Sequence, residues 1–259
     1  MNNDGMREYI VSLLNKNLRL DGRSLLEYRK PIKIELNVSK NAEGSARVII
    51  GETEVIAGVK LTVGTPFPDT PNEGVLIVGV ELLPLSSPEF ESGPPGVEAT
   101  EIARIVDRGI RESGMIDVEK LVIKKGELVW MIFLDIYTVN DAGNLIDASA
   151  LAAVAALKNS VLPKLNGDKV VFGEHTKEKL PLKRLAITCT LSKINDKILL
   201  DVNEKEEDVI DSRLTVAISE KNNIHALQKG GNKGLTIEDI DAMIDIAQEK
   251  TKELRKLLG

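Results

Sequence analysis

The amino-acid sequence predicts an α+β protein made of two halves behind an N-terminal helix. Strands followed by helices occur twice, up to residue 162 and again from residue 185. Apolar residues alternate in the expected strands and recur every three to four positions in the expected helices. A polar connector separates the two runs, although they share no convincing sequence identity. We therefore expect an N-terminal helix with an Asp-Gly-Arg segment (1–30), a first half (31–165) and a second half (182–259).

Composition excludes several classes of protein. The chain has 259 residues, of which 42% are hydrophobic and 29% charged, as in ordinary globular domains. A net charge of −6 excludes a surface that is basic all over, but it allows a local basic stripe. Because only 3% of the residues are aromatic, we do not expect a platform of stacked aromatic side chains for single-stranded nucleic acid.

The expected location is the cytoplasm. The single cysteine, Cys189, cannot form an internal disulfide, and this is typical of a reducing compartment. No apolar run approaches the ~18 residues that a membrane span requires. The first ten residues, MNNDGMREYI, lack the apolar core of a signal peptide.

The elements of the first half follow from periodicity and turn residues. Residues 5–17 read as a helix with Met6, Ile10, Leu13 and Leu14 on one face. Strands are expected at 31–39, 45–50, 54–63, 74–83, 122–124 and 128–139, the fourth of them buried on both faces. The proline-rich stretches 66–74 and 84–96 are expected to be exposed connectors. Helices are expected at 97–113, which is amphipathic, and at 148–162, where alanine on nearly every side predicts packing between two layers.

The second half starts after the connector, in which a short hairpin is expected around residues 166–168. Strands are expected at 185–191, 197–202, 213–218 and 224–227. Thr236 should then cap the last helix, with Glu238 and Asp239 in its first turn.

The junction at residues 139–147 has the backbone pattern of an anion site. A strand ends in Asp141-Ala142-Gly143, and a helix begins near Asp147, so that helical N–H groups should face the turn. No cation stands between Lys125 and Lys158, however. The stretch therefore predicts a phosphate pocket that has kept its turn and lost its charge.

Several motifs, in order, resemble the ribonuclease PH superfamily. They are Arg19-Leu-Asp-Gly-Arg23 followed by Glu27 and Arg29, Gly44-Ser-Ala-Arg-Val48, Gly51-Glu-Thr-Glu-Val55, and Leu200-Asp-Val-Asn-Glu204. The proline-rich loop 66–74 is similar to that of the forty-two-type, non-catalytic ring subunits of the archaeal exosome. The resemblance implies the ribonuclease PH fold, two βαβ-type halves of the ribosomal protein S5 domain 2-like kind.

The resemblance also implies an assembly and a reaction. Three heterodimers with a catalytic ribonuclease PH-like subunit would form a hexameric ring that threads single-stranded RNA, and RNA-binding cap proteins would sit on the ring. The catalytic partner would remove nucleotides from the 3′ end with inorganic phosphate.

Compared with catalytic relatives, this chain departs in three places. Asn144 and Leu145 stand where the family has a hydroxyl and an arginine that bind phosphate. The region that matches the family's paired arginines, residues 93–98, contains no arginine. The family also has an aspartate shortly after a Glu-Asp pair. This chain has the pair at Glu207-Asp208, but the position of the later aspartate falls near Arg213 and Leu214. Asp211 is the alternative acid. We expect no catalytic residue, no cofactor and no metal, since His175 and His225 lack zinc-site spacing.

Arg104, Arg108 and Arg111 share one face of the helix expected at 97–113. In one interpretation this face is solvated, and Glu101, Asp107 and Glu112 pair with the arginines. In the other, which the family favours, the three arginines bind the RNA backbone beside the partner's active site.

The other charged residues singled out have structural expectations. For Arg19 and Arg23 the alternatives are ion pairing with Asp21, Glu27 or Asp135 and contact with RNA, and we expect the ion pairing. Asp201 and Asp208 resemble family acids by position, but with no arginine beside them they should be turn and cap residues. Cys189 should lie in the core, and residues 229–234 should form a turn, because they lack a phosphate-loop pattern.

Three functions are compatible with the fold. The first is a structural, non-catalytic and RNA-guiding subunit of an exosome ring, which helps to shape the active site of its catalytic partner. The second is an independently active, phosphate-dependent exoribonuclease, against which the Asn144-Leu145 pair weighs. The third is a metabolic enzyme for a small phosphorylated ligand, and the absence of a glycine-rich nucleotide loop weighs against it.

Overall fold

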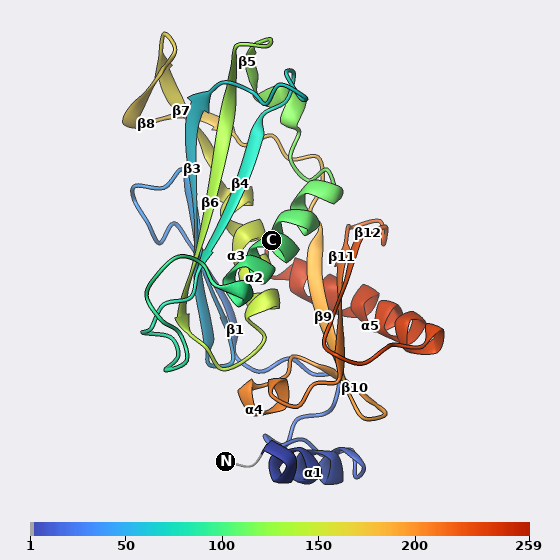
Figure 1. The fold of residues 1–259 in the computed structure, drawn as a ribbon. Coiled ribbons are helices and arrows are strands. Elements are labelled where there is room, and N and C mark those ends of the chain that lie inside the picture. Colours follow the sequence, from blue (N-terminus) through green and yellow to red (C-terminus); the bar gives the residue numbers. More distant parts are fainter. Residues whose placement is uncertain (1–2) are drawn as a thin grey trace.

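The computed structural model describes residues 3–259, so residues 1 and 2 of the expected N-terminal segment lie outside it. The first half is a sheet with the strand order β1 (Ile32–Leu36), β2 (Gly44–Ile50), β3 (Thr53–Gly64), β6 (Leu128–Asn140) and β4 (Val75–Glu81), with β5 (Val122–Lys124) also paired to β6. β4 runs parallel to β6, and helix α2 (Val97–Glu112) lies between them in the chain. This crossover forms a βαβ unit (Figure 1).

The second half is a smaller antiparallel sheet. Its order is β10 (Lys197–Leu200), β9 (Ile187–Ile194), β11 (Ser212–Ile218) and β12 (Ile224–Gly230). Helix α5 (Ile237–Lys256) packs on β9 and β11. Thr236 caps α5 as expected, since its hydroxyl accepts from the Asp239 N–H at 3.2 Å, and the Asp239 carboxylate accepts from the Thr236 N–H.

Helix α3 (Leu145–Asn159) joins the two halves. It packs against β2 and β3 of the first sheet and against β9 of the second. Its alanines, from Ala148 to Ala156, are buried, which confirms the packing between layers that their pattern predicts. α3 therefore presents its amino end at the seam between the halves, where the 141–144 turn lies.

Helix α1 (Asn3–Leu14) docks on a small apolar cluster of its own. Ile10 and Leu14 are buried there against residues of the second half: Ile194, Leu199, Val202 and Val209. The apolar face expected for this helix is thus confirmed, and it covers the loop around the short helix α4 (Glu204–Glu207). Within residues 3–259 the structure has no helix long and apolar enough to cross a membrane.

Four expectations need correction. α3 starts at Leu145, earlier than residue 148. α3 also ends at Asn159, before residue 162, and a long hairpin, β7 (Val161–Asn166) with β8 (Lys169–Lys179), follows where only a short one was expected. α4 and the turn of 3₁₀-helix Val118–Leu121 were not expected, because single turns carry little periodicity. Burial of β4 on both faces is wrong, since β4 is an edge strand whose Ile77 is 38% exposed. Both proline-rich stretches are connectors with mostly exposed residues, as expected.

Candidate nucleic-acid interface

The turn of residues 141–144 keeps the backbone geometry of an anion site. Gly143 has φ 99°, and a Cβ at this position would lie 2.6 Å from the Val202 carbonyl oxygen, so the turn requires glycine. Asn144 follows in the left-handed region with φ 55° and precedes the first residue of α3. Thr53 fixes the turn from β3, because its hydroxyl donates to the Gly143 carbonyl at 2.6 Å.

The N–H groups of this turn are already occupied by the chain itself. The Asn144 N–H donates to the Glu207 carboxylate at 2.9 Å, and the Gly143 N–H donates to the Asp141 carboxylate at 2.9 Å. The Ala142 N–H donates to the Thr53 hydroxyl at 3.2 Å. An incoming phosphate would therefore have to displace two carboxylates from the positions where it needs donors.

The side chains at the two replaced positions also give a phosphate nothing to bind. Asn144 is buried, and its amide N–H₂ donates to Asp201 at 2.8 Å and to Asp147 at 3.3 Å. Leu145 is 3% exposed and offers no donor. The hypothesis of a turn without its charge therefore agrees with the geometry.

An acidic cavity of about 360 Å³ lies beside this turn, between the amino ends of α2 and α3 and the α4 loop. All three departures from the catalytic pattern meet in its lining, which includes Glu98, Asn144, Leu145 and Arg213. Seven carboxylates line it: Glu89, Glu98, Glu101, Asp141, Glu204, Glu207 and Asp208. Arg213 lines it as well, but its guanidinium is paired with Glu101 at 2.6 Å.

The carboxyl pKa values reflect this crowding. Desolvation raises the pKa of Glu207 to about 7. The charge of Asp141 also raises it, whereas the hydrogen bond from the Asn144 N–H lowers it. Desolvation and the neighbouring Asp141 and Glu89 raise the pKa of Glu98. Desolvation also raises the pKa of Asp141. The cavity is thus an unfavourable place for a dianion. The sequence alone showed that cations are missing from this site. Only the structure showed that acidic side chains take their place, although the acidic run at 204–208 was a signal for this in the sequence.

Asp211, the alternative acid, lies outside the lining of the acidic cavity. Its carboxylate is held by Arg7 at 2.7 Å and Lys233 at 2.9 Å, and it accepts from the Asn195 N–H at 2.7 Å. These bonds lower its pKa against the opposing effect of burial. Asp211 therefore anchors α1 and the 231–234 turn to the second sheet.

The three arginines of α2 project from the same exposed face but differ in their partners. Arg111 forms a 2.6 Å ion pair with Asp107 and donates to the Leu76 carbonyl of β4 at 3.1 Å. Arg108 lies 4.0 Å from Glu112, and Arg104 has no ion-pair partner among the described residues. Glu101, expected as a partner for these arginines, pairs with Arg213.

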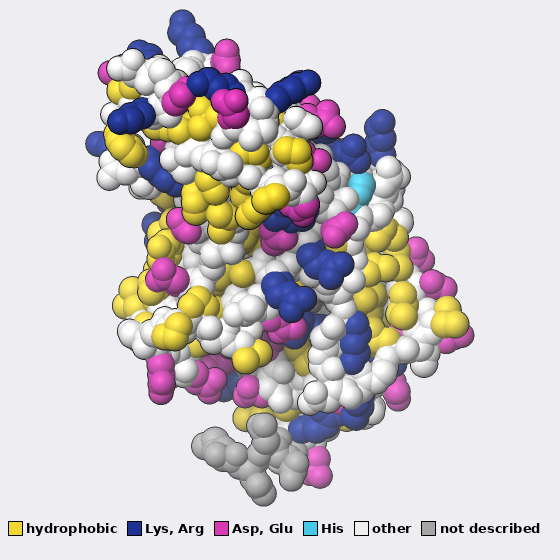
Figure 2. Space-filling view, turned by 45° about the horizontal axis from the view of Figure 1, so that its top comes forward, with side chains coloured by type: hydrophobic (Ala, Val, Ile, Leu, Met, Phe, Trp, Pro, Cys, Tyr) yellow, Lys and Arg dark blue, Asp and Glu magenta, His cyan; other side chains and the backbone are white. Residues whose placement is uncertain are grey.

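Arg104 and Arg108 border a groove between α2 and β4. Its floor is formed by small apolar residues, Val78, Val80, Ala99 and Ala103. In Figure 2, lysine and arginine side chains lie near the middle of the face beside apolar surface, and acidic side chains are close to them. The face is therefore mixed in charge, as the net charge predicts. RNA contact by Arg104, Arg108 and Arg111 stays a prediction.

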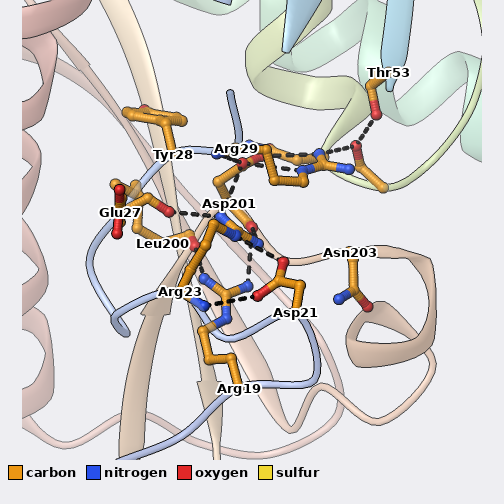
Figure 3. A network of polar contacts seen from close by, with 12 residues as sticks. Arg19, Asp21, Arg23, Glu27, Tyr28, Arg29, Thr53, Leu200, Asp201 and Asn203 are labelled. Atoms are coloured by element: carbon orange, nitrogen blue, oxygen red, sulfur yellow. Dashed lines mark hydrogen bonds and ion pairs between the residues drawn. The ribbon is translucent and has the colours of Figure 1, made fainter. Parts of the chain in front are cut away.

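A second polar cluster, which we call the arginine clasp, consists of Arg19, Arg23, Arg29, Asp201 and Glu206. Figure 3 shows its three arginines close to Asp201. Arg19 and Glu206 are fully buried and paired, with Arg19 Nε donating to Glu206 at 3.0 Å. Arg29 binds Asp201 through Nε at 3.0 Å and Nη2 at 2.9 Å, and it also donates to the Gly143 carbonyl at 2.7 Å. The clasp ties the Asp-Gly-Arg segment to the second half and to the 141–144 turn.

The arginine clasp confirms the structural ion pairing expected for Arg19 and Arg23 and corrects its partners. Arg23 pairs with Asp21 at 2.7 Å as expected, and also with Asp201 at 3.2 Å. Arg19 pairs with Glu206, which was not among the candidates, and Asp135 pairs with neither arginine. The expectation that Asp201 has no arginine beside it is wrong, because its partners lie more than 170 residues away in the chain.

The remaining candidates are structural. Asp208 is the C-cap of α4, as expected, and Cys189 is fully buried. Residues 229–234 begin with the last residues of β12 and continue into a turn. Within the part of the chain that is described, no three His, Cys, Asp or Glu residues come together in a way that could hold a metal ion.

Comparison with known proteins identifies the family. The 3′ exoribonuclease family model matches residues 28–163 with its domain 1 and residues 184–250 with its domain 2. The exosome complex component Rrp42 of Methanothermobacter thermautotrophicus is 46% identical over 254 residues, covering 97% of this chain and 93% of that protein. Rrp42 of Thermococcus gammatolerans is 46% identical over 258 residues, covering 98% and 93%.

The solved structures agree. A chain of the Archaeoglobus fulgidus exosome with RNA bound to the active site superposes with a TM-score of 0.90 at 43% identity, covering 99% of each chain. A chain of an archaeal exosome core gives 0.85 at 40% identity, covering 99% of this chain and 97% of that one. These matches confirm the ribonuclease PH fold expected from the motifs. The chain belongs to the 3′ exoribonuclease (ribonuclease PH) family, within which it is similar to the Rrp42 components of archaeal exosomes.

Proposed function

We propose that the chain is a non-catalytic subunit of an archaeal-type exosome, a cytoplasmic complex that degrades RNA from the 3′ end by phosphorolysis. In this proposal, three copies alternate with three copies of a catalytic ribonuclease PH-like partner in a hexameric ring, on which RNA-binding cap proteins sit. Residues 31–165 and 182–259 are its two ribonuclease PH-like units, behind the segment 1–30. The similarity to Rrp42 components over nearly the whole chain supports the assembly.

One observation carries the assignment of a non-catalytic role. The carboxylates of Glu207 and Asp141 accept hydrogen bonds from the N–H groups of the 141–144 turn, which we call the phosphate turn. Phosphorolysis requires a phosphate held by donors and positive charge next to the scissile bond. Here the donors are taken and seven acidic side chains surround the site. Bound phosphate would meet repulsion where a catalyst needs attraction.

The contribution to RNA handling is assigned to the exposed face of α2. Within residues 3–259 Arg104 has no ion-pair partner and Arg108 has only a distant one, so both guanidinium groups can bind phosphate groups of the RNA backbone. Arg111 contributes less, because Asp107 and the Leu76 carbonyl already occupy its donors. Contacts of this kind give weak base specificity and clear salt dependence.

The test is an RNA-degradation assay with and without the catalytic partner of a related archaeal exosome. We expect no release of nucleoside diphosphates from a labelled poly(A) RNA by this chain alone with phosphate, and efficient release by the mixture. Size-exclusion chromatography of the mixture should show a ring-sized complex. Phosphate-dependent release by the isolated chain would instead support the independently active exoribonuclease.

A further inference from the structure

Asp147 places a fully buried carboxyl group at the seam between the two halves. It is the third residue of α3 and has 0% exposure. Its Oδ2 accepts from the Thr190 N–H of β9 at 3.1 Å, from the Tyr28 hydroxyl at 3.2 Å and from the Asn144 side chain at 3.3 Å. One oxygen atom thus joins the second sheet, the Asp-Gly-Arg segment and the phosphate turn.

The charge of this carboxyl is not balanced. Nearby Asp201 is paired with Arg23 and Arg29, whereas Asp147 forms no ion pair within residues 3–259. Its Oδ1 has no hydrogen-bond partner there either. An isolated carboxylate without water or a cation is costly, and a buried one shifts towards its neutral form.

The groups that face Asp147 do not supply the missing charge. From the Asp-Gly-Arg segment comes the Tyr28 hydroxyl, which also contacts the Cys189 thiol of β9 at 3.4 Å. From the loop after β10 comes Asp201, a like charge. From α5, the charge of Lys250 lowers the pKa of the Cys189 thiol, but Lys250 is itself paired with Glu253 at 2.9 Å.

We propose that Asp147 in its neutral form keeps the two halves packed together and that its ionisation loosens this packing. The contact between the halves would then be a pH-sensitive switch. Desolvation raises the pKa of Asp147 to about 7. The charge of Asp201 also raises it, whereas the hydrogen bonds from Thr190 and Asn144 lower it. The proton is therefore bound more tightly in the folded chain than in the unfolded one. The stabilisation is complete below the ordinary aspartate pKa of 3.8 and is lost as the pH rises through about 7.

The test is denaturant unfolding of the full chain between pH 5 and pH 8. Asp147 should increase the unfolding equilibrium constant by roughly a hundredfold across this range, and Asp147→Asn should lack that part of the increase. Glu207→Gln is the matched control, because it removes a different carboxyl with a raised pKa and should leave the Asp147 contribution in place. Parallel pH profiles for the wild type and Asp147→Asn would overturn the proposal.

A second variant keeps the test decisive if Asp147→Asn does not fold. Tyr28→Phe removes one donor to the carboxylate and should therefore move the pH of the transition upward. Infrared spectra of Glu207→Gln at pH 5 to 6, in which the other carboxyl with a pKa near 7 is removed, should still show the carbonyl stretch of a protonated buried acid. If the stability of Tyr28→Phe changed at the same pH as that of the wild type, or if the spectrum lacked the acid band, the proposed pH-sensitive switch would be contradicted.

Discussion

The arginine clasp and the acidic cavity both adjoin the turn of residues 141–144, but they differ in how their charges are balanced. In the clasp, Arg19 and Arg29 are buried and Arg23 is half-buried, and all three are paired with carboxylates and backbone carbonyls, so that their charges are balanced. In the cavity, seven carboxylates face one arginine that is already paired. The fold can thus keep the shape of a phosphate turn while its donors serve internal contacts.

The largest effect is expected from breaking the arginine clasp at its centre. Asp201→Ala would leave the buried Arg29 and the half-buried Arg23 without their shared partner and should lower the free energy of unfolding by about 3–5 kcal/mol. Urea unfolding measures this. Asp208→Ala, an exposed position in the same loop, should change stability by less than about 0.5 kcal/mol. Equal, small losses in both variants would show that the clasp does not hold the seam.

The turn between the two clusters should be the next most sensitive point. Gly143→Ala places a Cβ against the Val202 carbonyl at φ 99° and should cost about 2–4 kcal/mol, since both strain and overlap contribute. Gly234→Ala is the control, because nothing lies within 4 Å of its Cβ position. If the two glycine variants unfold at the same urea concentration, the close packing of the turn on the α4 loop is refuted.

The acidic cavity should respond to substitution in the opposite direction from the clasp. Glu207→Gln keeps an acceptor for the Asn144 N–H and removes a charge whose pKa is raised to about 7. A raised carboxyl pKa stabilises the fold below the ordinary value of 4.5, and this contribution is lost as the pH rises through about 7. Because Glu207 is partly exposed to solvent, we expect a gain of only about 1 kcal/mol at pH 8.

Thermal unfolding at pH 5 and pH 8 checks this prediction. At pH 5 the gain from Glu207→Gln should largely disappear. A loss of stability at pH 8 would show that the carboxylate stabilises the turn and that the two clusters are alike.

The smallest effect is expected on RNA binding by the assembled ring. Replacing both Arg104 and Arg108 with alanine should reduce the slope of log affinity against log salt by about 1.4, or ~0.7 for each phosphate contact on single-stranded RNA. Arg111→Ala, which removes a paired guanidinium, should change the slope less. Fluorescence anisotropy across a salt series measures both. An unchanged slope in the double variant would support the solvated interpretation of this face.

The sequence was most informative where local patterns decide structure. The periodicity of α5 with its Thr236 cap, the amphipathic α2 and the alanine-rich α3 were all predictable, because caps and apolar stripes are local properties. The loss of phosphate ligands at Asn144 and Leu145 was also readable as a departure from a motif.

The partners of buried charges were not predictable. Arg19 meets Glu206, and Arg29 meets Asp201, across more than 170 residues, and nothing in the local sequence specifies such pairs. The occupation of the Asn144 N–H by Glu207 depends on the packing of α4 against the turn, and a single turn of helix leaves little periodic signal. The edge position of β4 follows from sheet order, and the sequence does not encode that order locally.

Phosphate binding by the isolated chain decides whether the 141–144 turn still works as an anion site. A phosphorus NMR titration should show no saturable binding at neutral pH in the wild type, because the chain's own carboxylates occupy the turn. Saturable binding by the wild type that becomes tighter in Glu207→Gln would locate phosphate on the turn and contradict this expectation.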